Sequence, residues 1–415
     1  MAYSDKTRQA FVDDIGEIKN KGIFKEKRFI CSPQGATISV EYPEGSPRED
    51  VLNFCANNYL GLSSHADVIK AAHEGLDSRG YGMSSVRFIC GTQDIHRELQ
   101  NKMSGFLGME DTLLFPSCMD ANAGVFEAIL EQEDVIIADR LIHASLVDGI
   151  RLCSAQYDTF KHMNMKHLEK KLELHQDKRH RLIVTDGVFS MDGDLCPLDE
   201  VCELAEKYDA MVLVDESHAS GFIGRTGRGT HEHFDVMDRV DIITTTFGKA
   251  LGGASGGCVS GRKELVELCR QKARPYLFSN SMAPPIVAAS IKVIEVLSKT
   301  TERRDKLEEN TQRFRERMTS AGLNIRSGVT PIVPVMLYNA KLANDMARDM
   351  YAEGIYVIGF FFPVVAAGAA RIRVQLSAAH EFEHIDKCVD AFAKVGEKYG
   401  IIGMDKKAII DKYGM

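Results

Sequence analysis

The chain has 415 residues, of which 44% are apolar and 27% are charged, and its net charge is −8. This composition is typical of a globular protein and excludes the disordered, collagen-like and disulfide-scaffold classes, while the length predicts more than one domain. The negative charge argues against a general nucleic-acid-binding protein. No apolar run is long enough to cross a membrane. The ten cysteines form no CxxC pair, so we expect reduced thiols and no metal site.

Residues 1–55 are expected to form one or two charged helices up to about residue 30, followed by a small hairpin. The strings ATISVEY and VLNFC alternate as strands do, and they flank the turn-rich PEGSPRED. The N-terminal sequence contains acidic residues and no apolar stretch, so it resembles neither a secretory signal nor a transit peptide. We therefore expect a cytoplasmic protein.

Residues 56–290 are expected to form a large domain, in which short runs rich in Val, Ile and Leu alternate with helix-like segments. Nearly continuous apolar strands separated by helices indicate a largely parallel sheet that is covered on both faces. Ligands of such sheets bind at the carboxyl ends of the strands. The expected strands are 112–117, 134–139, 181–187, 210–217, 241–248 and 256–261.

Residues 291–415 are expected to form a smaller α+β domain. A long helical region begins after Pro284, strands are expected at 332–337, 354–361 and 370–376, and helices around 384–398 follow. The predicted fold class is therefore α/β, with a mostly parallel central sheet in the large domain and a smaller α+β C-terminal domain.

The segment VLVDESHASGFIG (212–224) places two polar side chains beside the end of a strand. Four apolar residues lead to Asp215, and His218 follows three residues later. A carboxylate at this position can pair with a cationic ring nitrogen or orient a histidine. The alternative is an aspartate that caps the next turn, with a histidine at the surface.

The segment TTTFGKALGGASGG (244–257) places Lys249 after an apolar strand and before a glycine-rich turn. A buried lysine is unfavourable unless it has a function, and desolvation lowers its pKa and makes it a usable amine for Schiff-base chemistry. Thr246 and nearby backbone amides can bind a phosphate. The alternative for Lys249 alone is a solvated lysine in a packing turn.

Together the two segments fit pyridoxal 5′-phosphate (PLP). This cofactor needs an amine for its aldehyde, an anion for its pyridinium nitrogen and donors for its phosphate. Lys249, Asp215, His218 and Thr246 supply these groups from strand ends that are close in sequence.

Nearly the whole chain resembles the α-oxoamine synthases, a family of fold-type-I PLP-dependent transferases. The resemblance rests on long blocks that occur in the family's order: NFCANNYLGL (53–62), GYGMSSVRFICGTQDIHRELQ (80–100), RLIHASLVDGIRLC (140–153), TDGVFSMDG (185–193), the two segments above, RPYLFSNSMAP (274–284) and ARIRVQLSAAH (370–380).

The resemblance implies catalytic roles for four residues. Lys249 would hold the cofactor covalently and act as the base that removes the α-proton of the amino acid. Asp215 would pair with the pyridinium nitrogen, and His218 would reach the phenolic oxygen of the cofactor. His143 would stack on the ring and contact substrate; without the family, it would be interpreted as a half-buried structural histidine. Ile142 stands before it where the family often has Asn.

The resemblance also implies positions for the phosphate. Backbone groups of Cys118 and Met119 would join Thr246 there, with Met119 standing where close relatives are expected to have an aromatic residue. Ser279 and Asn280 would reach the phosphate of a neighbouring subunit, which implies a homodimer with shared active sites.

The substrate contacts are implied in the same way. Ser190 would touch the cofactor's oxygen or the substrate, and Arg373 would clamp the substrate carboxylate with help from Asn57. Arg371 is a near neighbour of Arg373, but Arg373 lies seven residues before His380, as in the family.

The family type that the blocks resemble most condenses glycine with acetyl-CoA to give 2-amino-3-oxobutyrate and CoA, a reaction that connects to a threonine dehydrogenase in threonine breakdown. Sister enzymes of the 8-amino-7-oxononanoate, 5-aminolevulinate and serine-palmitoyl types share the same core and remain alternatives. No nucleic-acid or membrane partner is expected.

Two alternatives lie outside this activity. The residues around Ser255 match the G-x-S-x-G pattern of α/β-hydrolases, although that turn should directly follow a strand whose end is here taken by Lys249. Some members of the fold are inactive partner subunits that lack the cofactor lysine, and the presence of Lys249, Asp215 and His143 argues against this.

Overall fold

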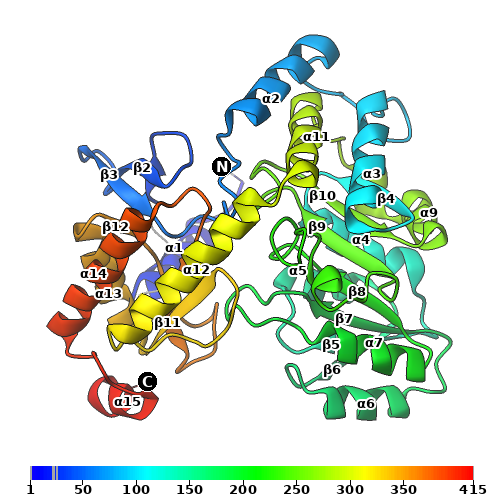
Figure 1. The fold of residues 1–415 in the computed structure, drawn as a ribbon. Helices are drawn as coiled ribbons and strands as arrows, with labels where there is room; N and C mark the ends of the chain where they lie inside the picture. Colours follow the sequence, from blue (N-terminus) through cyan, green and yellow to red (C-terminus); the bar gives the residue numbers. More distant parts are fainter. Residues whose placement is uncertain (1, 21–23, 25–26, 415) are drawn as a thin grey trace.

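The computed structural model describes residues 2–20, 24 and 27–414. They form two lobes, with the seven-stranded sheet in one lobe and the smaller sheets in the other (Figure 1). This arrangement confirms the predicted fold class. No helix among the described residues is both long and apolar enough to cross a membrane.

The central sheet has the strand order β4-β10-β9-β8-β7-β5-β6. Neighbouring strands from β9 to β6 run parallel, and β10 runs antiparallel to both β4 and β9. All six predicted strands are present, and the mostly parallel sheet is confirmed. The strands are β4 (Asp111–Phe115), β5 (Val135–Asp139), β6 (Gln156–Phe160), β7 (Arg181–Asp186), β8 (Met211–Asp215), β9 (Ile242–Thr246) and β10 (Gly257–Gly261).

Helices cover both faces of this sheet. Successive residues of β5 enter different cores: Val135 and Ile137 belong to one, and Ile136 and Ala138 to the other. This explains why strands such as β5 and β7 carry nearly continuous apolar runs. The first core also includes α3 (Asp94–Leu107), α6 (Met165–Leu174) and α7 (Leu198–Lys207), and the second includes α4 (Cys118–Ile129), α5 (Ala144–Leu152) and α9 (Lys263–Lys272).

Strand β6 and two short helices, α8 (Thr230–His233) and α10 (Arg274–Phe278), were not among the predicted elements. β6 lies at the edge of the sheet and has the sequence QYDTF, in which only Phe160 is buried. An edge strand that is half exposed lacks the continuous apolar run on which the prediction depended.

The second lobe is built around the three-stranded sheet β11-β14-β13. The predicted single strand at 354–361 is wrong. It is divided into β12 (Ile355–Tyr356) and β13 (Gly359–Phe360), which belong to different sheets. The other elements of this lobe are α12 (Glu302–Ser320), β11 (Ile332–Tyr338), α13 (Ala340–Ala352), β14 (Ala370–Gln375), α14 (Phe382–Tyr399) and α15 (Lys406–Tyr413). Helix α11 (Pro284–Lys299) packs instead on α2 (Ala66–Arg79) and on α3 of the first lobe (Figure 1).

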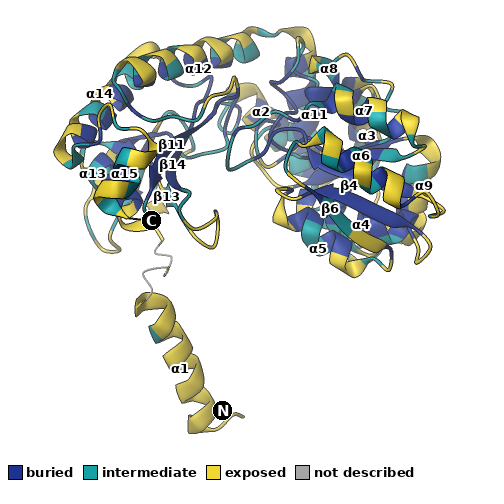
Figure 2. Ribbon diagram, turned by 90° about the horizontal axis from the view of Figure 1, so that it is seen from below, coloured by how far each residue is buried: buried dark blue, intermediate teal, exposed yellow. Residues whose placement is uncertain are grey.

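The predicted N-terminal hairpin is confirmed as β2 (Thr37–Glu41) and β3 (Arg48–Asn53). It forms a sheet with β1 (Phe29–Ile30) and with β12, which pairs parallel to β3. The N-terminal segment therefore shares a sheet with residues of the C-terminal part, and the domain limits at 55 and 290 stay a prediction. Of the helices expected up to residue 30, the structure has α1 (Asp5–Asn20), which is exposed along its length (Figure 2); residues 21–23 and 25–26 lie outside the described residues.

Candidate active site

A cavity of about 250 Å³ lies at the carboxyl ends of the central strands. It brings together seven of the residues predicted from the sequence, and these come from four different strand ends and the loops that follow them. They are Cys118, Met119, His143, Asp215, His218, Thr246 and Lys249.

Asp215 is the last residue of β8 and is almost completely buried. Its Oδ2 accepts a hydrogen bond from Asn122 Nδ2 at 2.9 Å, and its Oδ1 accepts one from the backbone N–H of Ser217 at 2.8 Å. These bonds fix the carboxylate at the wall of the cavity, where it can balance a positive charge on a bound group.

Lys249 follows β9 in a turn and lines the same cavity. Its Nζ makes no hydrogen bond or ion pair to the rest of the described chain. Burial lowers its pKa, while the nearby Asp215 acts in the opposite direction. Lowering the pKa favours the neutral amine, the form that can attack an aldehyde.

The N-terminus of α4 forms one wall of the cavity. Ser117 caps the helix by accepting a hydrogen bond from Asp120 N–H, and the first helical amides, those of Cys118 and Met119, have no intrahelical acceptor. Gly257 of β10 packs against this turn, and a Cβ there would overlap the backbone of Cys118. Free amides at a helix N-terminus suit an anion such as a phosphate. Met119 is 48% exposed, and it lines the cavity beside the helix start.

Tyr59 fixes the ring of His218. Both side chains are buried, and Tyr59 Oη lies 2.8 Å from His218 Nδ1. Burial, followed by the charge of Lys249, lowers the pKa of His218 well below its usual value, so the ring is neutral. The buried Tyr59 hydroxyl needs an acceptor, and Nδ1 is its hydrogen-bond partner. The ring proton of His218 therefore resides on Nε2, which is free to donate.

His143 is the N-cap of α5. Its Nδ1 accepts a hydrogen bond from Ser145 N–H at 3.2 Å and lies 2.7 Å from Ser145 Oγ. Its own backbone N–H donates to Asp186 Oδ1 at 3.1 Å. Burial lowers the pKa of His143, which favours a neutral ring that can pack on a flat group in the cavity.

Arg373 and Arg371 have different environments. Arg371 is held by protein groups through two of its nitrogens, since its Nε donates to Ala369 O and its Nη1 to Met191 O and Asp192 Oδ1. Arg373 donates through Nη1 to Ser190 O at 2.8 Å, but its buried Nε has no partner among the described residues. Arg373 thus retains donors for a ligand.

Several predicted residues lie outside the walls of the cavity. Ser190 contacts Arg373 through its carbonyl oxygen, and the buried Asn57 Oδ1 has no hydrogen-bond partner within the described part of the chain. Ser279 is partly buried and Asn280 is exposed, and neither contributes to the cavity of its own chain.

The hydrolase hypothesis is wrong. Ser255 lies exposed in the turn between β9 and β10 rather than in a strand-to-helix turn. His380, the histidine considered for it, is buried and stacks on Phe54, and its ring bonds Asn53 O and Ser377 N.

The residues of the site that were not predicted from the sequence include Tyr59, Asn122, Ser145 and Asp186. Asp186 carried a usable signal, because it ends β7 as Asp215 ends β8, and the two residues are register partners. Tyr59 and Asn122 bond His218 and Asp215 on other elements, and Ser145 accepts a hydrogen bond from Asn122 besides its local contact with His143. A pattern of apolar residues does not reveal such contacts.

A family model described as aminotransferase class I and II matches residues 49–392. The 2-amino-3-ketobutyrate coenzyme A ligase of Escherichia coli K12 is 55% identical over 396 residues, covering 95% of this chain and 98% of that protein. The mitochondrial 2-amino-3-ketobutyrate coenzyme A ligase of Homo sapiens is 53% identical over 389 residues, covering 94% of this chain and 92% of that protein. A serine palmitoyltransferase from S. paucimobilis, solved with a bound PLP–myriocin aldimine, is 28% identical with a TM-score of 0.88, covering 96% of this chain and 99% of that one. The chain therefore belongs to the aminotransferase class I and II family, and within it is similar along nearly its whole length to 2-amino-3-ketobutyrate coenzyme A ligases.

Proposed function

We propose that this protein is a PLP-dependent glycine C-acetyltransferase, which condenses glycine with acetyl-CoA to give 2-amino-3-oxobutyrate and free CoA. The observation that carries the proposal is the cavity, in which a lysine with a lowered pKa and a buried carboxylate face the same space. The names of the E. coli and human relatives support the choice of substrates.

The residues of the cavity fit PLP. Lys249 offers the amine for the aldehyde, Asp215 the anion for the ring nitrogen, and the first turn of α4 with Thr246 the donors for the phosphate. When bound, PLP supplies an electron sink that stabilises a carbanion at the amino-acid α-carbon.

The protein groups then position the reactants and move one proton. Lys249 Nζ takes the proton from the α-carbon of glycine. With PLP bound, His218 would donate from Nε2 to the phenolic oxygen of the cofactor, and His143 would pack on its ring. In the net reaction a C–C bond forms between the glycine α-carbon and the acetyl carbonyl carbon, the thioester C–S bond breaks, and the proton leaves with the CoA sulfur.

Arg373 is proposed to hold the glycine carboxylate, with Asn57 and Ser190 beside the substrate. Replacing Arg373 with lysine should raise the KM for glycine roughly 10- to 100-fold, because a bidentate, charge-assisted contact is lost. Steady-state kinetics with glycine as the varied substrate checks this. Arg371→Lys should instead act mainly on stability, since Arg371 bonds only protein groups; the opposite pattern would assign the clamp to Arg371.

Tyr59→Phe should lower kcat/KM roughly 5- to 100-fold, because the ring proton of His218 would no longer be fixed on Nε2 and a buried acceptor would be left unpaired. The pH dependence of the bound cofactor's visible absorbance should change with it. Tyr208→Phe is the matched control, since its hydroxyl bonds Glu169 and Glu173 near the surface. Equal effects of the two variants would argue against the role of Tyr59.

We also propose a homodimer, a cytoplasmic location and a metabolic partner for this protein. Ser279 and Asn280 are proposed to complete the phosphate site of a second subunit in a homodimer, which fits their place outside their own cavity. A cytoplasmic location and a functional link to a threonine dehydrogenase are part of the proposal, for a chain whose human relative is named as mitochondrial.

The deciding experiment supplies purified protein with PLP, records its visible absorbance, and then follows free thiol with glycine and one acyl-CoA at a time. We expect an absorbance band that changes with glycine, and thiol release with acetyl-CoA. Release only with succinyl-, pimeloyl- or palmitoyl-CoA would move the chain to a sister synthase. The absence of any band in the presence of PLP would overturn the proposal.

A further inference from the structure

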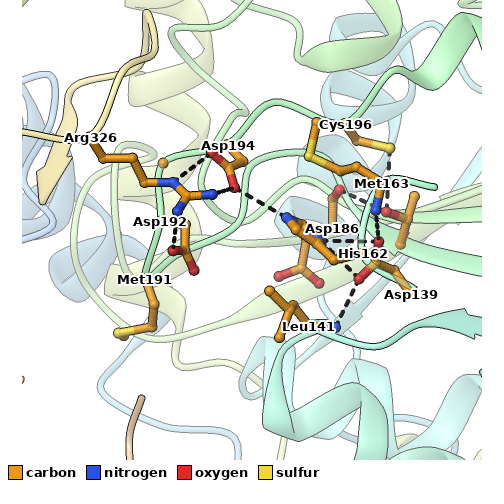
Figure 3. A network of polar contacts seen from close by, with 12 residues as sticks. Asp139, Leu141, His162, Met163, Asp186, Met191, Asp192, Asp194, Cys196 and Arg326 are labelled. Carbon is orange, nitrogen blue, oxygen red and sulfur yellow. Dashed lines mark hydrogen bonds and ion pairs between the residues drawn. The ribbon is translucent and has the colours of Figure 1, made fainter. Parts of the chain in front are cut away.

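An ionic network outside the cavity joins the two lobes beside the site (Figure 3). It begins at the end of β5, passes through the imidazole of His162 and the turn 187–196, and ends on arginines of the second lobe. Its charged members are Asp139, His162, Asp194, Asp192, Arg326 and Arg371.

His162 occupies the centre of this network and faces a carboxylate on each side. Its Nδ1 lies 3.0 and 3.1 Å from the two carboxylate oxygens of Asp139, and its Nε2 lies 3.1 Å from Asp194 Oδ2. An ionised carboxylate only accepts hydrogen bonds, so both ring nitrogens must donate, and the ring is an imidazolium. Phe189 packs edge-on against it at 4.4 Å between ring centroids.

Both carboxylates accept further hydrogen bonds, and although burial acts in the opposite direction, the bonds from His162 and Arg326 lower the pKa of Asp194 to about 2. Asp139 accepts the backbone N–H groups of Leu141 and Met163, each at 2.8 Å. Asp194 accepts Arg326 Nε at 3.0 Å and Nη2 at 2.6 Å. Burial opposes the charge on His162, but the bonds to both carboxylates outweigh it and raise its pKa to about 9.

Each carboxylate belongs to a segment that carries a predicted active-site residue. Asp139 holds the turn that leads to His143, whose backbone N–H reaches Asp186. Asp194 lies in the turn that carries Ser190, the carbonyl of which accepts Arg373 Nη1. His162 is thus the bridge between these two segments.

The second lobe holds the same turn from the other side. Arg371 donates to Met191 O at 2.9 Å and to Asp192 Oδ1 at 2.7 Å, and Arg326 bonds Asp194. Gly193 has φ +72°, and a Cβ there would overlap Ile332 O of β11, so the turn fits closely against the second lobe. At its base the turn is tied to His143 through Asp186, which accepts the His143 N–H, and further along, at Asp194, it is tied to the His143 segment through His162.

We propose that His162, as an imidazolium, is a positioning residue that keeps the Ser190 turn and Arg373 at a fixed position relative to His143. Binding of the substrate carboxylate by Arg373 then depends on the charge of His162. If His162 lost a ring proton, one of the two carboxylates would face a nitrogen lone pair instead of a donor. The turn 187–196 would then no longer be held on the side of His162. The charged groups facing His162 are Asp139 and Asp194, with Arg326 behind Asp194. The proposal relies on the proposed function for its kinetic test alone.

The sign of the pH dependence follows from the pKa. The value in the folded protein, about 9, lies above the ordinary 6.5. The contribution of the network to stability is therefore fully present below pH 6.5 and is lost as the pH rises through about 9.

The kinetic test compares the holoenzyme with His162→Gln and with His175→Gln, a control in which the lost imidazole bonds only Asp158, away from both turns. In the wild type, kcat/KM for glycine should fall as the pH rises through about 9. His162→Gln should raise the KM for glycine roughly tenfold, with a smaller change in kcat, and remove this alkaline step. Asp194→Asn, a milder change, should move the step to lower pH. A His162→Gln profile equal to that of His175→Gln would overturn the proposal.

A second measurement does not need activity. Amide hydrogen exchange of residues 139–143 and 189–194 should be faster in His162→Gln than in the wild type at pH 7, and the wild type should approach the variant above pH 9. Unchanged exchange in both segments would overturn the positioning role even if glycine condensation is confirmed. Faster exchange in a protein that does not condense glycine would uphold the network and reject the proposed function.

Discussion

Replacement of Lys249 by alanine should lower kcat/KM by at least about 10⁴-fold, because one side chain is proposed to anchor the cofactor and to move the α-proton, and general-base catalysis alone contributes 10²- to 10⁴-fold. The visible absorbance of lysine-bound cofactor should vanish. PLP should still bind non-covalently, since Asp215 and the first turn of α4 remain. Absorbance spectroscopy and thiol release with acetyl-CoA check both expectations.

A small primary amine in the buffer should restore part of the activity of this variant, because the substitution opens space beside Asp215 where such an amine can act as the base. Lys272→Ala is the control, an exposed lysine whose nearest acidic partner is Glu131. A Lys249→Ala protein that retains the absorbance band would show that another amine carries the cofactor.

Asp215→Asn should have the second largest effect, a loss in kcat of the order of 10²- to 10³-fold, with the overall fold retained. Asparagine has nearly the same shape but no charge, and breaking one side of a buried ion pair costs about 3–5 kcal/mol. The bond from Ser217 N–H can persist to the remaining oxygen. The cofactor should also bind more weakly, which a titration of the apoprotein with PLP measures.

Asp186→Asn provides a matched control for this charge. Asp186 ends the neighbouring strand and is equally buried, but burial, followed by the nearby Asp215, raises its pKa well above the usual value and favours the neutral acid. An amide in its place removes little charge and can still accept the N–H of His143, so we expect a loss below about tenfold. Equal losses for the two variants would contradict the assignment of Asp215 as the partner of the ring nitrogen.

Much of the fold was predictable because the burial of each central strand is visible in its own sequence as a short apolar run. Strands covered on both faces carry short runs that are mostly apolar, and all six strands predicted from such runs are present. The two errors in the predicted strands arise because an apolar run reports the burial of a segment but not the strand with which it pairs. β6 lies at the edge and is half exposed, and the short strands β12 and β13 form one apolar run although they join different sheets.

The sequence by itself determined the reactive groups: a lysine, an aspartate and two histidines beside strand ends, together with a helix start that can bind an anion. Parallel strands bring their carboxyl ends to one edge, so residues recognised separately meet in one cavity. Only the tertiary structure decided which groups orient them. Tyr59 contacts His218 from 159 residues away, and Asn122 reaches Asp215 over 93 residues. The bridge of His162 depends likewise on how the turn 187–196 meets β5 and the second lobe. Such contacts are set by strand order and lobe packing, which a local pattern of apolar residues does not encode.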